Sequence, residues 1–198
     1  NKPVGCTATI IYKMYVDAGV EIDTKTALLM CSAIISDTLI FRSPTCTEMD
    51  REAGKALAEI AGINIKEHAH EMFFAGSNIS EKTAKELFTG DFKRFSIGDT
   101  TFGIGQVSCM DGEELDQVKK KVMTYMKEQY KSLGVNMLYF MLTDIIKPGT
   151  ELLCVGDGAM ELVERAFGVQ GSDDVVYLPG VVSRKKQVVP EIMMEITQ

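Results

Sequence analysis

The strongest constraint on the fold is a change of character at residues 75–80, AGSNIS. Before this segment the sequence indicates helices only, because apolar residues recur at helical spacing. After it, strand-like runs alternate with helical stretches, which is typical of a layered α/β domain. The residues between the two parts are small and polar and include a glycine, as in a linker. We therefore expect two structural parts in this 198-residue chain.

The first part contains four expected helices. Thr24 is the expected N-cap of the second, which continues until Ser43-Pro44 because proline disfavours helical backbone in the residue before it. Thr47 followed by Asp50 resembles a capping box. The expected helices cover residues 7–18, 24–41, 48–61 and 65–75.

These helices lack a strand of their own, so their apolar residues need cover. A sheet outside this sequence, the other helices or a second chain could provide it. Without such cover we expect several large apolar side chains to meet water, at about 1.5–3 kcal/mol each. Examples are Ile34, Ile35, Leu39 and Phe41.

The second part predicts an α/β sandwich over residues 83–198. Ser80 is the expected cap of a short helix, and Asp111 of a long amphipathic helix over residues 112–133 that ends at Gly134. A further helix is expected at 158–167, after two glycines that favour a turn. The expected strands are Phe95–Ile97, Thr101–Cys109, Met137–Leu142, Leu152–Val155 and Val175–Leu178.

Composition excludes several classes of protein. The chain has 21 Lys and Arg against 28 Asp and Glu, a formal charge of −7, so an overall basic nucleic-acid footprint is absent. No apolar run reaches the roughly 18 residues of a membrane helix. The five cysteines form no C-x-x-C pair, which favours free thiols in a reducing compartment. His68 and His70 point to different helix faces, which argues against a shared metal site.

Asp37 stands out because a helix through residue 41 would place its carboxylate on an apolar stripe. Such a carboxylate is costly unless it is paired, hydrogen-bonded or bound to a metal. Two interpretations stay open. Asp37 could cap local backbone amides, or it could serve a metal or catalytic site.

Residues 183–187, SRKKQ, place three adjacent cations inside an apolar frame. Arg184 and Lys185 suit an anion site, since arginine offers a fork for phosphate oxygens and lysine a compact charge. The alternative is a solvated edge strand protected by its lysines. A regular strand would point Arg184 and Lys185 in opposite directions, so an anion site that uses both requires irregular backbone. Lys93, in GDFKRF, has no distinguishing local context.

Three segments together resemble the family II, manganese-dependent inorganic pyrophosphatases of the DHH phosphoesterase superfamily. They are PVGCTAT (3–9), SAIISDTLIFRSPTCT (32–47) and GVVSRKKQVVP (180–190). The resemblance implies that residues 1–76 are the helical tail of a DHH domain whose parallel sheet is missing, and that 77–82 are a linker. It implies that 83–198 are a complete substrate-binding α/β domain, a mixed sheet flanked by helices.

The resemblance also implies roles for individual residues. Asp37 matches a ligand of one metal of a pair. Lys93, Arg184 and Lys185 match residues that bind the substrate and neutralise its phosphate oxygens. The family's H-x-x-x-D-x-D and D-H-H motifs are absent, and one carboxylate does not make a two-metal site. We therefore expect the isolated chain to bind no metal and to be inactive.

The implied function is hydrolysis of pyrophosphate to two phosphates by a cytoplasmic enzyme that uses Mn²⁺, or Co²⁺ or Mg²⁺, when full-length. That enzyme is expected to be a homodimer that binds neither nucleic acid nor membranes. Because the sequence starts at Asn1 without Met, we interpret it as part of a longer gene product. The alternatives are an exopolyphosphatase-like phosphoesterase and, for the isolated chain, a non-catalytic phosphate-binding or oligomerisation module.

Overall fold

The computed structural model describes residues 3–77, 79, 81–109 and 112–197. Contacts divide the chain into two compact units, Asn1–Gly76 and Ser77–Gln198. The first unit is helical and the second combines helices with a sheet. The expected α/β class is therefore confirmed.

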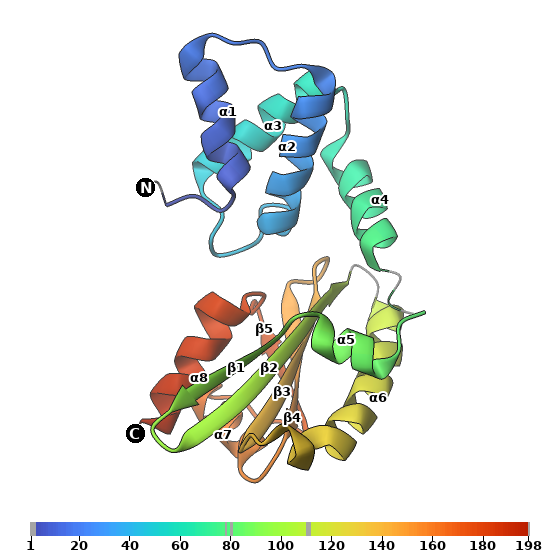
Figure 1. Ribbon diagram of the computed structural model, residues 1–198, viewed down its shortest axis with the longest axis vertical. Helices are drawn as coiled ribbons and strands as arrows, with labels where there is room; N and C mark the ends of the chain where they lie inside the picture. The colour runs from blue at the N-terminus through green and yellow to red at the C-terminus, as the bar shows by residue number, and fades with distance from the viewer. Residues whose placement is uncertain (1–2, 78, 80, 110–111, 198) are drawn as a thin grey trace. The chain divides into compact units, whose positions relative to one another are not determined.

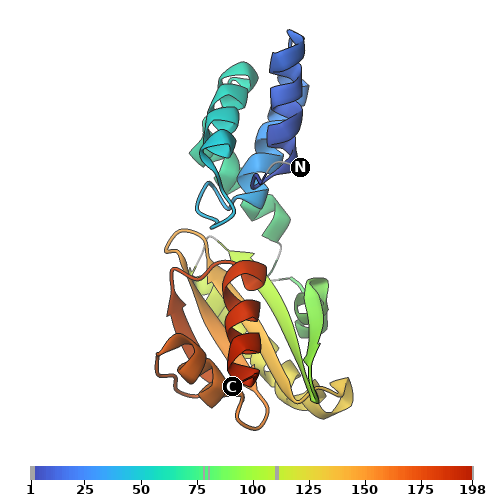
Figure 2. The ribbon, with the colours of Figure 1, turned by 90° about the vertical axis from the view of Figure 1, so that its left-hand side faces the viewer.

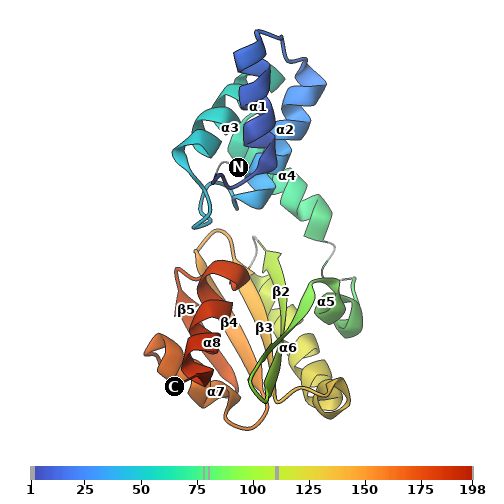
Figure 3. The same cartoon turned by 60° about the vertical axis from the view of Figure 1, so that its left-hand side comes forward.

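The first unit contains four helices whose amphipathic faces pack against one another. They are α1 (Thr7–Ala18), α2 (Thr24–Asp37), α3 (Glu48–Ala61) and α4 (Ile65–Ser77). Figure 3 shows α1 beside α2 and α3. Ile34 and Ile35 are fully buried in the core that these helices share, so of the three expected sources of cover the neighbouring helices provide it for these two residues. The large apolar side chains left exposed are others, including Met14 and Leu29.

Helix α2 ends four residues earlier than its apolar pattern predicts, and its N-cap is Asp23 rather than Thr24. After Thr38 the chain enters a left-handed turn, with φ values of 48°, 54° and 63° at Leu39, Ile40 and Phe41. The Thr38 hydroxyl donates to Ile34 O and accepts from Phe41 N, at 2.6 and 3.1 Å. These bonds fix the turn and end the helix.

The second unit is built on a five-stranded mixed sheet in the order β1-β2-β3-β4-β5. Strands β2 and β3 are parallel, and the other neighbouring pairs are antiparallel. A parallel pair needs a long crossover, which α6 (Gly112–Gln129) and a 3₁₀ turn (Tyr130–Leu133) provide. The strands are β1 (Phe92–Ile97), β2 (Thr100–Cys109), β3 (Met137–Asp144), β4 (Gly149–Val155) and β5 (Val175–Pro179).

Helices cover both faces of this sheet (Figure 1). On one face lie α7 (Ala159–Phe167) and α8 (Val189–Ile196), and on the other α5 (Ala84–Gly90) and α6. Figure 2 shows α8, in red, lying across the first face. Alternate residues of β3 point to the two cores: Met137, Tyr139 and Met141 to the α7/α8 core, and Leu138, Phe140 and Leu142 to the α5/α6 core.

The structure also contains elements that the sequence did not predict. Helix α8 and the preceding π-helical turn, Arg184–Val188, follow β5. Helix α5 is capped by Thr83, while the expected caps Ser80 and Asp111 lie outside the described residues. Within the described part of the chain, every helix is too short or too polar to cross a membrane.

Candidate functional site

The SRKKQ segment forms a π-helical turn, so the edge-strand interpretation is wrong. The Ser183 hydroxyl accepts from Lys186 N at 3.3 Å. The Gln187 side-chain oxygen accepts from Val182 N and Ser183 N, each at 3.0 Å. Serine and glutamine thus stabilise an irregular backbone, which is the condition that an anion site using both Arg184 and Lys185 requires. Single π turns occur often at functional sites.

Arg184 and the lysines that follow it have different surroundings. Arg184 is 6% exposed, and its guanidinium donates to Asp91 and to Ile104 O. Lys185 and Lys186 are exposed, and within the described part of the chain neither side-chain ammonium group has a hydrogen-bond or ion-pair partner. The turn therefore carries one anchored cation and two free ones.

Lys93 reaches the same face of the sheet from a distant part of the sequence. It lies on edge strand β1 opposite Ile104 of β2, and residues directly opposed in an antiparallel pair point to the same face. Ile104 belongs to the α7/α8 core, and its carbonyl also accepts from Arg184 at 3.2 Å. Lys93 and Arg184 thus adjoin the same residue, and Lys185 follows Arg184.

Asp37 lies exposed at the last position of α2, so the expectation that it sits on a buried apolar stripe is wrong. A carboxylate there faces the negative end of its own helix dipole, an unfavourable position by about 0.3–1 kcal/mol. The left-handed turn at residues 39–41 follows directly. Asp37 lies beside Cys6, whose pKa is raised to about 12 by burial and by the neighbouring Asp37 carboxylate.

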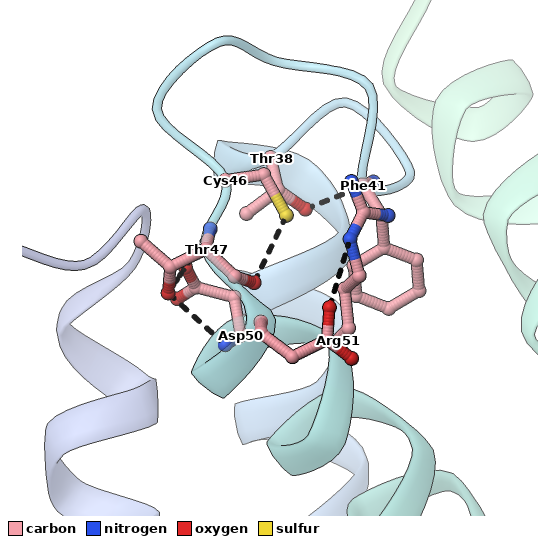
Figure 4. A network of polar contacts seen from close by, with 7 residues as sticks. Thr38, Phe41, Cys46, Thr47, Asp50 and Arg51 are labelled. Carbon is pink, nitrogen blue, oxygen red and sulfur yellow. Dashed lines mark hydrogen bonds and ion pairs between the residues drawn. The ribbon is translucent and has the colours of Figure 1, made fainter.

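A second carboxylate, Asp50, accepts from Thr47 at the N-cap of α3 (Figure 4) and lies near Cys6, the neighbour of Asp37. It is fully buried and completes the expected capping box with Thr47 at the start of α3. It also accepts from Gly5 N and Cys6 N at 2.8 and 3.2 Å and from the Thr9 hydroxyl at 2.6 Å. Asp50 therefore ties the beginning of α1 to the beginning of α3.

The hydrogen bonds of Asp50 set its ionisation. Burial raises the pKa of Asp50, but the hydrogen bonds from Thr9, Thr47 and Gly5 lower it by more, so that the pKa is about 2. Asp50 is thus a charged structural residue at neutral pH. Asp50 does not complete a metal site with Asp37. Among the described residues, no three His, Cys, Asp or Glu side chains lie together so that they could hold a metal.

Sequence reasoning missed two acidic residues of these sites. The local pattern identified Asp50 only as a cap, although its longest-range bond reaches Gly5, 45 positions away. Asp91 was not singled out, and it contacts Arg184 across 93 positions. No local signal marks either contact, since both depend on the folded chain.

Residues 70–194 match the model of the DHHA2 domain. The chain belongs to the DHHA2 domain family. The resemblance to family II pyrophosphatases is likewise confirmed by relatives and by a solved structure.

Two relatives of this DHHA2 chain come from clostridia. A Clostridium acetobutylicum protein named "Probable manganese-dependent inorganic pyrophosphatase" is 47% identical over 196 residues, which are 99% of this chain and 63% of that protein. The "Cobalt-dependent inorganic pyrophosphatase" of Clostridium perfringens is 44% identical over 197 residues, 100% of this chain and 36% of that protein. The chain thus spans less than two thirds of either relative.

A solved structure shares the fold. The crystal structure of a Methanococcus jannaschii protein assigned to the family II inorganic pyrophosphatases superimposes with a TM-score of 0.83 at 40% identity. The match covers 100% of this chain and 66% of that one.

Proposed function

We propose that the chain is the substrate-binding portion of an inorganic pyrophosphatase, which hydrolyses pyrophosphate to two phosphates. One observation carries the proposal: Lys93 and Arg184, from opposite ends of the second unit, adjoin the same residue, Ile104. Lys185 extends this cation cluster into solvent. The names of the relatives supply the substrate class.

The three cations suit different parts of this task. Lys93 and Lys185 are compact, mobile charges that can follow phosphate oxygens as charge develops on the leaving phosphate. Arg184 is held rigidly, so it can orient a phosphate group through its planar fork. On this proposal Lys93, Arg184 and Lys185 all touch the substrate.

The remainder of the proposal concerns the larger protein. Residues 1–76 would form the tail of a DHH domain, 77–82 a linker and 83–198 the substrate-binding domain, and the division of contacts after Gly76 supports this arrangement. The full-length protein would act as a cytoplasmic homodimer.

A metal pair, Mn²⁺ or Co²⁺ by the names of the relatives, would lower the pKa of a bound water and so supply the nucleophile. Asp37 is exposed and would contribute one ligand. The described residues hold no cluster of three candidate ligands, so the other ligands would have to lie outside this chain. What this chain contributes is the cation cluster of the second unit.

Titration with pyrophosphate tests the binding role. Charge-assisted hydrogen bonds contribute about 1.5–3 kcal/mol each before ordering costs, and the net charge of −7 opposes an anion. We expect a Kd on the order of 1 mM, about −4 kcal/mol. Backbone amide shifts should appear at Lys93, Arg184 and Lys185.

Two variants sharpen this test. Lys185→Met should weaken binding about tenfold, the equivalent of one charge-assisted bond. Lys120→Met makes the same charge change on α6, on the opposite face of the sheet, and should leave the Kd within about twofold. Equal losses in both variants would show that only net charge matters and would contradict the site.

Turnover distinguishes the enzyme classes. The full-length protein should release phosphate from pyrophosphate faster than from tripolyphosphate, and the opposite preference would favour an exopolyphosphatase. The isolated chain should show no metal-dependent turnover. Turnover by the pure chain would show that the catalytic machinery has been misplaced.

A further inference from the structure

Arg184 is the most tightly held cation of the cluster, and Asp91 holds it. Nη1 donates to Asp91 O and Ile104 O at 2.7 and 3.2 Å, and Nη2 donates to the Asp91 carboxylate at 2.7 Å. Asp91 is the C-cap of α5 and lies two residues before Lys93. The ion pair therefore joins the π turn to the start of β1.

Different contacts hold the Arg184 side chain in position and neutralise its charge. Two backbone carbonyls hold Nη1, and these would remain if the Asp91 side chain changed. The carboxylate supplies the only recorded negative charge on the guanidinium among the described residues. Its removal would leave Arg184 near its present place but without a counter-ion.

The exposures of the two side chains indicate which partner can leave. The Arg184 side chain is 6% exposed, whereas that of Asp91 is 43% exposed. Asp91 thus lies on the solvent side of the pair, and its carboxylate can move into water when another anion takes its place on the guanidinium, which is too buried to move. An anion approaching Nη2 from solvent would meet Asp91 first.

We propose that Asp91 is a built-in counter-ion that occupies Arg184 in the unliganded protein and is displaced by a phosphate oxygen of the substrate. The inference rests on the proposed function, which it deepens. Displacement leaves the carboxylate near the bound anion, so Asp91 opposes retention of phosphate. When the anion leaves, Asp91 pairs with Arg184 again, which favours release of product.

The proposed exchange predicts that one variant gains affinity for pyrophosphate and loses stability. Asp91→Asn removes the competing charge, so the chain should bind pyrophosphate about three- to tenfold more tightly, or about 0.7–1.4 kcal/mol. The same variant should unfold at lower urea concentration, because a buried guanidinium loses its counter-ion. A purely structural ion pair would lower stability and leave affinity unchanged or weaker.

Asp116→Asn is the matched control, because it removes one negative charge on α6, which packs on the opposite face of the sheet. It should change the Kd for pyrophosphate less than twofold. Tighter binding in both variants would attribute the gain to net charge and overturn the exchange.

The outcomes distinguish this inference from the proposed function. Wild-type binding that depends on Lys185, together with equal or weaker binding by Asp91→Asn, would overturn the exchange alone. Binding by Asp91→Asn without measurable wild-type binding would support it strongly. If neither chain binds pyrophosphate, the proposed function and the exchange both fail.

A measurement on the wild-type chain covers the case in which Asp91→Asn does not fold. The carboxyl ¹³C shift of Asp91 and the guanidinium ¹⁵N shifts of Arg184 should both move during a pyrophosphate titration, with the same apparent Kd. A moving Arg184 signal beside an unmoved Asp91 signal would overturn the exchange.

Discussion

Replacing Asp50 by Asn tests the contact network beneath Asp37. The substitution keeps the size of the side chain but replaces one acceptor oxygen by an NH₂ group. In the wild type, Oδ2 accepts from Gly5 N and Thr47 N at 2.8 and 2.7 Å, and Oδ1 accepts from Cys6 N at 3.2 Å. Whichever way the amide turns, at least one of these backbone donors faces another donor.

Two lines of reasoning give the size of the effect. Each buried N–H that loses its acceptor costs about 1–3 kcal/mol. Independently, the pKa of Asp50 falls from an ordinary 3.8 to about 2, so ionisation stabilises the fold by about 2–2.5 kcal/mol at neutral pH. We expect Asp50→Asn to lower the free energy of unfolding of the first unit by about 2–4 kcal/mol.

The pH dependence gives the reasoning a second test. Because the folded-state pKa is lowered, the contribution of Asp50 is complete above about pH 4 and is lost as the pH falls toward 2. The wild-type chain should therefore lose stability across this window more steeply than Asp50→Asn. The two proteins should approach one another near pH 2.

Urea unfolding followed by amide NMR signals measures each unit separately. Signals from α1 and α3 should disappear at lower urea in Asp50→Asn, while signals from β3 should be unchanged. Asp17→Asn is the control, since the Asp17 side chain is 63% exposed and forms an ion pair with Lys13 of the same helix. It should change stability by less than about 0.5 kcal/mol.

Two results would refute this account of Asp50. Equal stability of Asp50→Asn and Asp17→Asn at pH 7 would show that the buried carboxylate contributes nothing specific. An unchanged pH slope between 4 and 2 in Asp50→Asn would show that another group titrates in that window.

Three further predictions concern other parts of the chain. Gly54→Ala should cost about 1–3 kcal/mol, because its Cβ would lie 2.7 Å from an aromatic carbon of the left-handed turn; Gly90→Ala, with open space at the Cβ, is the control in urea unfolding. Gln187→Ala should weaken pyrophosphate binding and destabilise the π turn by about 2–4 kcal/mol, since two backbone N–H groups lose their acceptor. Gln187→Glu keeps an acceptor but loses the Nε2 bond to Gly180 O and adds a negative charge, so it should restore only part of the stability and none of the binding. In alkylation at pH 8 followed by mass spectrometry, half-buried Cys46 should react well before Cys154, whose thiol pKa burial raises strongly; earlier reaction of Cys154 would contradict the burial argument.

The sequence predicted the sheet because its signals are strong and local. The run MLYFML in β3 is apolar on both faces, as a central strand covered by helices must be. The helix ending at Gly19 and the Thr47–Asp50 capping box were also predicted correctly. In each case the pattern that indicates the element lies within a few residues of the chain.

The failures occurred where specific side-chain contacts override the apolar pattern. The apolar periodicity of α2 continues through Phe41, yet the helix ends at Asp37 because Phe41 packs against Gly54 of α3. Likewise, cations between valines resemble a strand, but side-chain bonds of Gln187 bend residues 184–188 into a π turn. The Phe41–Gly54 contact cannot be read from neighbouring residues, and the bonds of Gln187, although local, match no standard capping pattern.

The candidate site shows a third limit of sequence reasoning. The resemblance selected Arg184, but nothing in the sequence distinguishes a free phosphate-binding arginine from one already paired. Only the fold reveals the Asp91 partner, 93 positions away. On our proposal, this pair changes the expected chemistry from simple capture of an anion to exchange of one anion for another.

Two of the segments that carry the family resemblance depart from regular local structure. Three consecutive non-glycine residues adopt positive φ after Asp37, and a π turn begins at the buried Arg184. Backbone conformations of the first kind cost about 1–3 kcal/mol each, and a carboxylate at a helix C-terminus adds to this cost. Regular alternatives exist for both segments, since α2 has the pattern to continue and SRKKQ the pattern of a strand. Side-chain bonds of Thr38 and Gln187 hold the irregular backbone in place of those alternatives. On the proposed function, this geometry is what presents Asp37 to a metal and Arg184 to a phosphate group.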